Sequence, residues 1–199
     1  MKANTQTESA QAPAEWTVVE GKALRNNEAQ RLEVEYHELK KQYEIMEATF
    51  VGATMLALFQ ERPWLQSATI RLTASYEYGD EGDYYRSISS TVTDVTCVAN
   101  CVVPADLADE KGCLDSEAAA DSLHSNISDS SLDGDLYCSM VSPWDAEEIK
   151  LKLDRNLVAH LLEQNVASGK DAFRLLFPDE HHRIGEMRVT AQTSEAVTA

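Results

Sequence analysis

Apolar residues recur between residues 32 and 57 at alternating steps of four and three, and this repeat constrains the fold more than any other feature. Such steps place the residues on one face of an α-helix of about seven turns. Asn26 and Asn27 can cap its start, and Pro63 ends it because the residue before a proline avoids helical angles. We therefore expect a long N-terminal helix at 27–62. The stripe consists of Leu32, Tyr36, Leu39, Tyr43, Met46, Phe50, Ala53 and Ala57.

The stripe needs a surface to pack on, since an apolar helix face is stabilised by burial. From Ala48 to Phe59 the helix is apolar almost all round, which indicates that this half is buried. The favoured interpretation is that the stripe lies on the protein's own sheet. Self-association as a homodimer through the first helix is the alternative.

A β-hairpin is expected directly after this helix. Residues 68–78 alternate between apolar and polar, which is typical of a half-buried strand, and the glycines and acids of 79–83 suit a turn. The β-branched residues of 84–103 predict the returning strand, so the hairpin covers 67–103. Its apolar alternation slips by one residue near Thr93–Asp94, which indicates a β-bulge.

Three further elements are expected downstream. Short runs near 136–141 and 184–193 predict strands, and an apolar residue at every fourth position predicts a C-terminal helix at 143–167. Ser142 followed by Pro143 is typical of a helix start, since serine caps a helix and proline suits its first turn.

Together these elements predict an α+β fold, in which both helices pack on one face of a small antiparallel sheet. We expect a flexible lead at 1–20, a single domain at 21–192 and a flexible tail at 193–199. Within the domain, residues 104–135 form an acidic insertion that is either a functional loop or a disordered one. A short helix at 116–123 is an alternative for its middle part.

The net charge of −17 is concentrated in one part of the chain. Residues 76–148 hold 17 acidic residues against only Arg86 and Lys111, so this segment carries −15. A direct nucleic-acid ligand is not expected, because proteins that bind nucleic acid usually present a basic face. No membrane partner is expected either, because no apolar run reaches the roughly 18 residues that a span requires. The N-terminus lacks the apolar segment of a secretory signal, which favours a cytoplasmic protein.

The hairpin tip combines tyrosines with carboxylates, and the acidic insertion adds more negative charge. Tyrosine offers a large rigid contact face, and surrounding acids steer a basic partner. The leading hypothesis is a non-enzymatic protein that binds a basic, nucleic-acid-binding protein surface, in the manner of small acidic inhibitors or anti-defence proteins of phages and plasmids. In the alternative, the tyrosines only cover the end of the sheet. The candidate partner-binding residues are Tyr76, Tyr78, Asp80, Glu81, Asp83, Tyr84, Tyr85, Asp129, Asp133 and Asp135.

No metal or cofactor is predicted, but two metal-binding alternatives stay open. Cys97 and Cys101 are candidate zinc ligands, although two positions this far apart on one strand would hold the thiols about 13 Å apart. Residues 129–135, or the turn at 80–83, offer oxygen ligands for calcium, but the twelfth loop position is Met140 instead of a bidentate glutamate. The other candidate zinc ligands are Cys113, His124 and Cys138.

A catalytic alternative rests on His181 and His182, which follow two acidic residues. Histidine titrates near neutral pH and serves in acid–base chemistry. However, neighbouring side chains diverge, and the chain has no nucleophile-elbow, zinc-protease or phosphate-loop motif. The sequence therefore favours a binding protein over an enzyme.

Overall fold

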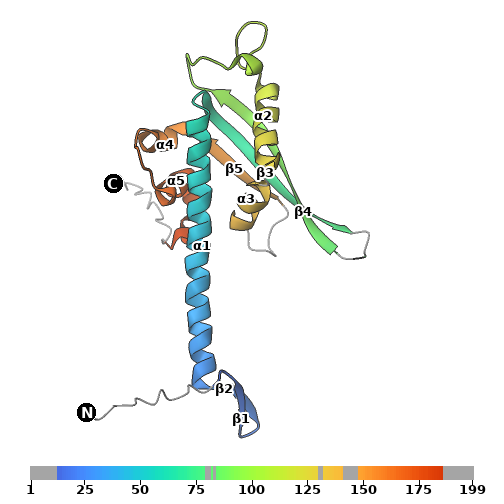
Figure 1. Cartoon of the computed structure of the whole chain (residues 1–199), viewed down its shortest axis with the longest axis vertical. Coiled ribbons are helices and arrows are strands. Elements are labelled where there is room, and N and C mark those ends of the chain that lie inside the picture. Colours follow the sequence, from blue (N-terminus) through green and yellow to red (C-terminus); the bar gives the residue numbers. More distant parts are fainter. Residues whose placement is uncertain (1–12, 79–81, 83, 130–131, 141–147, 186–199) are drawn as a thin grey trace, which may run out of the picture. The chain divides into compact units, whose positions relative to one another are not determined.

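The chain is an α+β protein with two antiparallel sheets, as expected (Figure 1). It divides into two compact units, Met1–Tyr43 and Glu44–Ala199. The helix α1 (Asn27–Glu61) contributes to both units and confirms the long helix predicted at 27–62. The structure is a computed structural model, and it describes residues 13–78, 82, 84–129, 132–140 and 148–185.

The first unit contains a two-stranded hairpin that was not expected from the sequence. β1 (Trp16–Val19) pairs antiparallel with β2 (Lys22–Arg25). Glu20 and Gly21 join the strands with φ angles of 51° and 77°, which are the left-handed angles that a tight two-residue turn requires. The segment 1–20, for which only a flexible lead was expected, therefore contributes a strand.

The second unit is built on a three-stranded antiparallel sheet with the order β4-β3-β5. The predicted hairpin is confirmed as β3 (Leu65–Tyr78) and β4 (Tyr84–Cys97), with a second strand shorter than expected. The chain leaves the sheet after Cys97, and Asn100 takes a left-handed φ of 59°. The third strand, β5 (Glu148–Asp154), lies on the other side of β3.

The predicted β-bulge is confirmed by the pairing of β3 with β4. Thr69 pairs with Thr93, whereas Ser67 pairs with Thr96, so β4 contains one residue more than β3 in this interval. Asp94 lies in the irregular stretch with a φ of 54°, which is uncommon outside glycine. The bulge leaves the Asp94 side chain exposed at the edge of the sheet.

One face of this sheet is buried and the other is open. Ala68, Ile70 and Leu72 on β3 are buried in the core, whereas Arg71 and Thr73 point to the opposite face and are more exposed. The buried face shares a single hydrophobic core with residues from the second half of α1 and from the later helices (Figure 1). The helix layer on one side of the sheet therefore agrees with the predicted architecture.

Residues 104–135 do not form the long loop that was expected. The middle of the segment folds into the helix α2 (Ser116–Asp129), which packs along β4 and is longer than the short helix considered at 116–123. The reason is a stripe at steps of four residues, Ala119, Leu123 and Ile127, whose members are all buried. A few well-spaced apolar residues are thus enough to order an otherwise polar, acidic helix.

The strand expected near 136–141 is also wrong. These residues lie mostly in the helix α3 (Leu132–Met140), where Leu136 and Tyr137 are fully buried. Arg86 on β4 fixes α3 to the sheet, because its guanidinium donates to the Tyr137 hydroxyl at 2.7 Å and lies over the ring. A short 3-10 turn, η1 (Ala105–Leu107), precedes α2.

The C-terminal helix predicted at 143–167 is wrong in its first half. β5 occupies Glu148–Asp154, and the helix α4 (Arg155–Leu162) begins only after it, capped by the Asp154 side chain. Ile149 and Leu153 are four residues apart, a spacing that fits a helix and a strand equally well. The expected Ser142–Pro143 helix start lies outside the described residues.

The end of the chain also differs from expectation. The short helix α5 (Gly169–Leu176) is capped by Ser168 and is followed by the 3-10 segment η2 (Pro178–Ile184). The predicted strand 184–193 does not begin at Ile184, which belongs to η2. The remainder from residue 186 lies outside the described residues.

The C-terminus of α1 is capped by the half-buried side chain of Arg155, which comes from a distant part of the chain. The Arg155 guanidinium donates to the backbone carbonyls of Phe59 at 2.8 Å and Leu65 at 3.4 Å. The bond to Phe59 satisfies a carbonyl that the helix end leaves without an intrahelical partner, and the bond to Leu65 ties the start of β3 to the same guanidinium. Arg155 also places positive charge at the negative end of the helix dipole. Burial lowers the pKa of Arg155.

Candidate functional site

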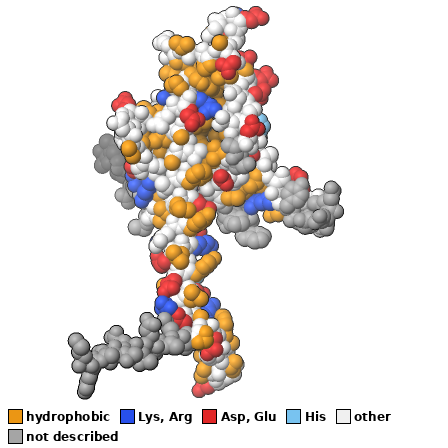
Figure 2. All heavy atoms as spheres, viewed as in Figure 1, with side chains coloured by type: hydrophobic (Ala, Val, Ile, Leu, Met, Phe, Trp, Pro, Cys, Tyr) orange, Lys and Arg blue, Asp and Glu red, His pale blue; other side chains and the backbone are white. Residues whose placement is uncertain are grey.

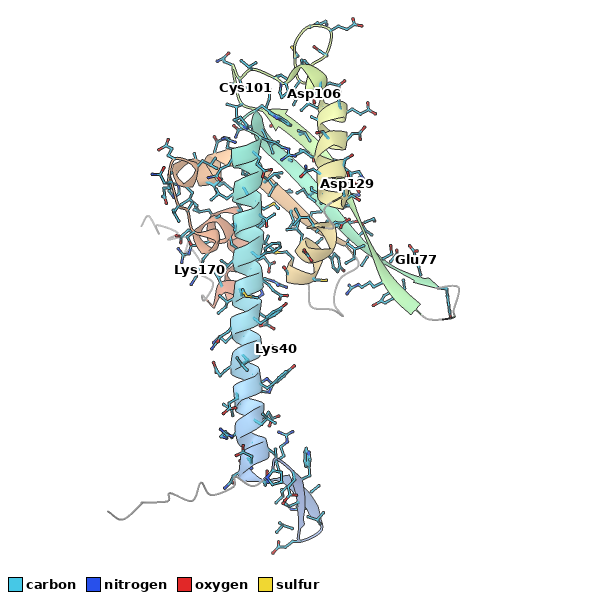
Figure 3. All side chains as sticks on the ribbon, viewed as in Figure 1. Lys40, Glu77, Cys101, Asp106, Asp129 and Lys170 are labelled. Atoms are coloured by element: carbon cyan, nitrogen blue, oxygen red, sulfur yellow. The ribbon has the colours of Figure 1, made fainter. Side chains whose placement is uncertain are left out.

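Exposed carboxylates accompany β4 along much of its length. α2 runs antiparallel to the strand, with His124 Nδ1 lying 3.2 Å from Ser90 Oγ near the middle of both elements. Asp106 lies beyond one end of α2 and Asp129 at the other, and Glu77 lies farther along the hairpin (Figure 3). We call the exposed acidic residues of this region the acidic band: Asp94, Asp106, Asp109, Glu110, Asp115, Glu117, Asp121 and Asp129.

An open groove of about 580 Å³ lies between the bulge of β4 and the first turns of α2. Asp94 lines it from the strand, and Glu117 and Asp121 line it from the helix. The half-buried Ala120, between the two helical acids, also lines the groove and leaves it wide because its side chain is a single methyl group. The groove is thus flanked by negative charge from two elements.

The backbone before α2 is held in place by two aspartates of the acidic band. Asp109 Oδ1 accepts hydrogen bonds from the Lys111 and Cys113 amides at 2.9 and 2.8 Å. Asp115 caps α2 by accepting from two amides of the first turn at 3.0 and 3.1 Å. These carboxylates sit on an ordered backbone rather than on a free acidic coil.

Within the described residues, no member of the acidic band forms an ion pair with a basic side chain. The contrast with the open face of the sheet is clear, because there Glu148 lies between Arg71 at 3.7 Å and Lys150 at 3.3 Å. The ion pairs of the described residues therefore lie outside the acidic band, and its negative charge is not neutralised by basic side chains of the described chain.

The hairpin tip, which was the other half of the predicted site, is described only in part. The side chains of Tyr76 and Tyr78 are 58% and 69% exposed, so neither ring is part of the core. Glu77 lies farther along the hairpin than the candidate Asp129, while Asp106 of the acidic band lies toward the other end of it. Tyr84 and Tyr85 are in β4 but their side chains are not described, and Asp80, Glu81 and Asp83 lie outside the described residues.

The calcium interpretation of residues 129–135 does not fit the local structure. Asp129 ends α2, and Asp133 and Asp135 lie in the first turn of α3, so they do not share a loop. Asp133 Oδ1 accepts from the neighbouring Gly134 amide at 2.8 Å. Across the described ranges, no group of three or more His, Cys, Asp or Glu side chains is arranged to hold a metal ion.

The cysteines are free thiols in two different environments. Cys97 and Cys101 are half-buried, and the strand ends between them, so the expected separation of about 13 Å along one strand does not apply. Burial raises the pKa of the Cys101 thiol, and the nearby Cys97 raises it further. Cys113 and Cys138 are exposed.

The histidines do not form a catalytic arrangement in the described part of the chain. His182 is exposed and lies 3.7 Å from Glu180, while the side chain of His181 is not described. A pocket of about 420 Å³ includes Glu180 but is not lined by His182. Ser90 and His124 are hydrogen-bonded, but Ser90 is only 7% exposed, so its hydroxyl is closed to a substrate.

The groove residues Asp94, Glu117 and Asp121 were not among the candidates expected from the sequence. The sequence pointed to them only indirectly, through the bulge at Asp94 and the i, i+4 spacing of two acids on α2.

No protein-family model, curated protein or solved structure matches this chain. In the part that the structure describes, no helix has the length and apolarity needed to cross a membrane.

Proposed function

We propose that this chain is a non-enzymatic binding protein whose acidic band docks a basic protein surface. The observation that carries the proposal is the groove flanked by Asp94, Glu117 and Asp121, none of whose lining residues is basic. An arginine or lysine side chain of a partner would supply the positive charge and form charge-assisted hydrogen bonds there. Complementary charge of this kind governs specificity and the rate of association.

The ordered backbone beneath the acidic band supports binding over simple solvation. α2 is anchored by three buried apolar side chains, and its first turn is capped by Asp115. Carboxylates on such a helix lose less conformational freedom on binding than carboxylates on a free coil. The exposed Tyr76 and Tyr78 offer rigid aromatic faces on the same hairpin for additional contacts.

The proposal extends to the kind of partner. A basic protein surface of this sort is typical of nucleic-acid-binding proteins. A chain of 199 residues with a charge of −17 would compete for such a surface. We therefore propose that the chain acts in the cytoplasm as an inhibitor or anti-defence protein of a phage or mobile element.

A binding titration with a short fluorescent arginine-rich peptide tests the groove. The double variant Glu117→Gln/Asp121→Asn removes two of its carboxylates while preserving side-chain size. We expect its Kd at low salt to be about tenfold higher than that of the unaltered protein, because two charge pairs are lost. Fluorescence anisotropy at several salt concentrations measures both the affinity and its salt dependence.

The matched control is Glu20→Gln/Glu38→Gln, which makes the same change of net charge at exposed positions of the first unit. We expect this control to bind the peptide as the unaltered protein does. Equal weakening by both double variants would mean that the peptide responds only to overall charge, and would contradict a docking groove. Failure of the unaltered protein to bind at low salt would contradict the whole proposal.

A further inference from the structure

Helix α1 carries two apolar faces that point in opposite directions. The buried face, with Ala48, Val51, Met55 and Phe59, packs into the core of the second unit. The stripe of 32–57 was expected to make this contact, and that expectation is wrong. Phe50 belongs to the stripe and is nine residues from Phe59, so at 3.6 residues per turn the two rings point to opposite sides of the helix.

The stripe is exposed along its whole length within the described chain. Its large side chains, from Leu32 to Phe50, are between 41% and 64% exposed. Figure 2 shows hydrophobic side chains along the surface of α1. Large apolar side chains in an unbroken row are unusual on a protein surface and mark a place where another protein surface binds. The six are Leu32, Tyr36, Leu39, Tyr43, Met46 and Phe50.

The spacing of the stripe indicates the shape of the protein surface that would bind it. Alternating steps of three and four average 3.5 residues, which is the period of helices that wind around each other in a left-handed coiled coil. Tyr36, Tyr43 and Phe50 take one of the two seam positions of each heptad, called a. The residues at the other seam position, d, are Leu32, Leu39 and Met46.

We propose that two copies of this chain associate through the stripe as a parallel two-stranded coiled coil. A seam of this period is complementary to itself, because the side chains of each helix fill the gaps of an identical one. If each of the six side chains buries on the order of 100 Å², the two copies bury about 1,200 Å² together, which is at the lower end of stable specific interfaces.

One pair of charges beside the stripe, Glu35 with Lys40, fits the parallel alignment, whereas the equivalent pair one heptad earlier, Glu28 with Glu33, carries like charge. Glu35 precedes the seam residue Tyr36, and Lys40 follows the seam residue Leu39. In a parallel coiled coil, these positions of opposite copies face each other on both sides of the seam. Each Glu35, which also pairs with Arg31 of its own helix at 3.0 Å, would then lie near Lys40 of the second copy. Figure 3 shows the Lys40 side chain extending from α1.

The N-terminal end of the stripe runs into a second apolar surface of the first unit. Ala29, Leu32 and Tyr36 line a groove of about 580 Å³ together with Trp16 from the β1–β2 hairpin. The Arg25 guanidinium lies over the Trp16 ring at 4.9 Å and fixes its orientation. The groove extends the seam by one position, Ala29, and gives the second copy an aromatic contact beyond the helix.

The mass in solution tests this proposal through one pair of matched variants. Leu39 and Val34 are 64% and 63% exposed on opposite faces of α1, so an aspartate at either position is tolerated by the folded monomer. We expect light scattering after size exclusion to give twice the 22.1 kDa chain mass for the unaltered protein and for Val34→Asp. Leu39→Asp should give the single-chain mass at the same concentration, with an unchanged circular dichroism spectrum.

A single-chain mass for the unaltered protein, or the same response in both variants, would overturn the proposal. Disulfide capture then tests the alignment. In a Cys113→Ser/Cys138→Ser background, Leu39→Cys should link two copies under mild oxidation, because identical d residues face each other in a parallel coil. Val34→Cys should not link. Absence of the Leu39→Cys link would overturn the parallel alignment. These tests do not depend on the acidic band, because Leu39 and Val34 lie outside it.

Discussion

At the scale of single residues, the four thiols differ in environment and should therefore differ in reactivity. The reactive species is the thiolate, and burial raises the pKa of Cys101 above that of an ordinary thiol. We expect native-state labelling with a thiol reagent at pH 8 to show a fast phase from the exposed Cys113 and Cys138. Cys97 and Cys101 should react at least tenfold more slowly.

The raised pKa of Cys101 also determines how the free energy of unfolding changes with pH. The pKa of Cys101 is higher in the folded state than in the unfolded chain. The contribution of this thiol to the free energy of unfolding is therefore fully present below the pKa of the unfolded thiol, and it is lost as the pH rises through the pKa of the folded thiol. The Cys113→Ser/Cys138→Ser variant should lose the fast phase and keep the slow one. Equal rates for all four thiols would show that the Cys97–Cys101 region opens readily.

At the scale of elements, the contact between α1 and α5 depends on two glycines. A Cβ at Gly52 would lie 2.0 Å from the Gly169 carbonyl oxygen and 2.6 Å from the Phe173 amide nitrogen. Both neighbours are backbone atoms, so the helices would have to move apart. We expect Gly52→Ala to lower the free energy of unfolding in urea by about 2 kcal/mol or more.

Gly134 provides the matched control, because it lies in α3 and a Cβ there would meet nothing within 4 Å. Gly134→Ala should raise the free energy of unfolding by up to about 1 kcal/mol through its better helix propensity. If both substitutions were stabilising, helix propensity alone would explain them, and the close α1–α5 contact would be contradicted.

The elements that the sequence predicted correctly are those with one unambiguous period. The repeat in α1 and the strict alternation in β3 each fit a single conformation, and Pro63 marks the helix end. Ile149 and Leu153 were misread because a spacing of four also fits alternation, as Lys150 and Lys152 between apolar neighbours show. The spacing of apolar residues predicts a helix or a strand only where the two conformations require different spacings.

The periodicity of α1 did not show which face meets the sheet. The stripe is the most regular apolar feature of the helix, yet the face with Val51 and Met55 is the one that is buried. Similarly, the groove joins Asp94 to Glu117 across a long stretch of chain, which no local spacing encodes. The composition shows where the acidic residues lie along the sequence. Their arrangement in space depends on the packing of α2 on β4, which composition does not predict.

At the scale of the whole molecule, the net charge of −17 sets how stability responds to salt. Like charges in the uncompensated acidic band repel each other in the folded state, and salt screens this repulsion with a Debye length of about 10 Å at 0.1 M. We expect the melting temperature to rise by about 3 °C between low salt and physiological ionic strength, which corresponds to roughly 1 kcal/mol for a chain of this size.

The variant Glu117→Gln/Asp121→Asn shows whether this salt response arises in the acidic band. Its melting temperature at low salt should exceed that of the unaltered protein, and its rise with salt should be smaller, because part of the repulsion is already removed. A matched concentration of sucrose stabilises without screening, and should raise both proteins equally. A melting temperature that falls with salt would mean that ion pairs such as Arg71–Glu148 outweigh the repulsion, and that the acidic band contributes little to the energy of the fold.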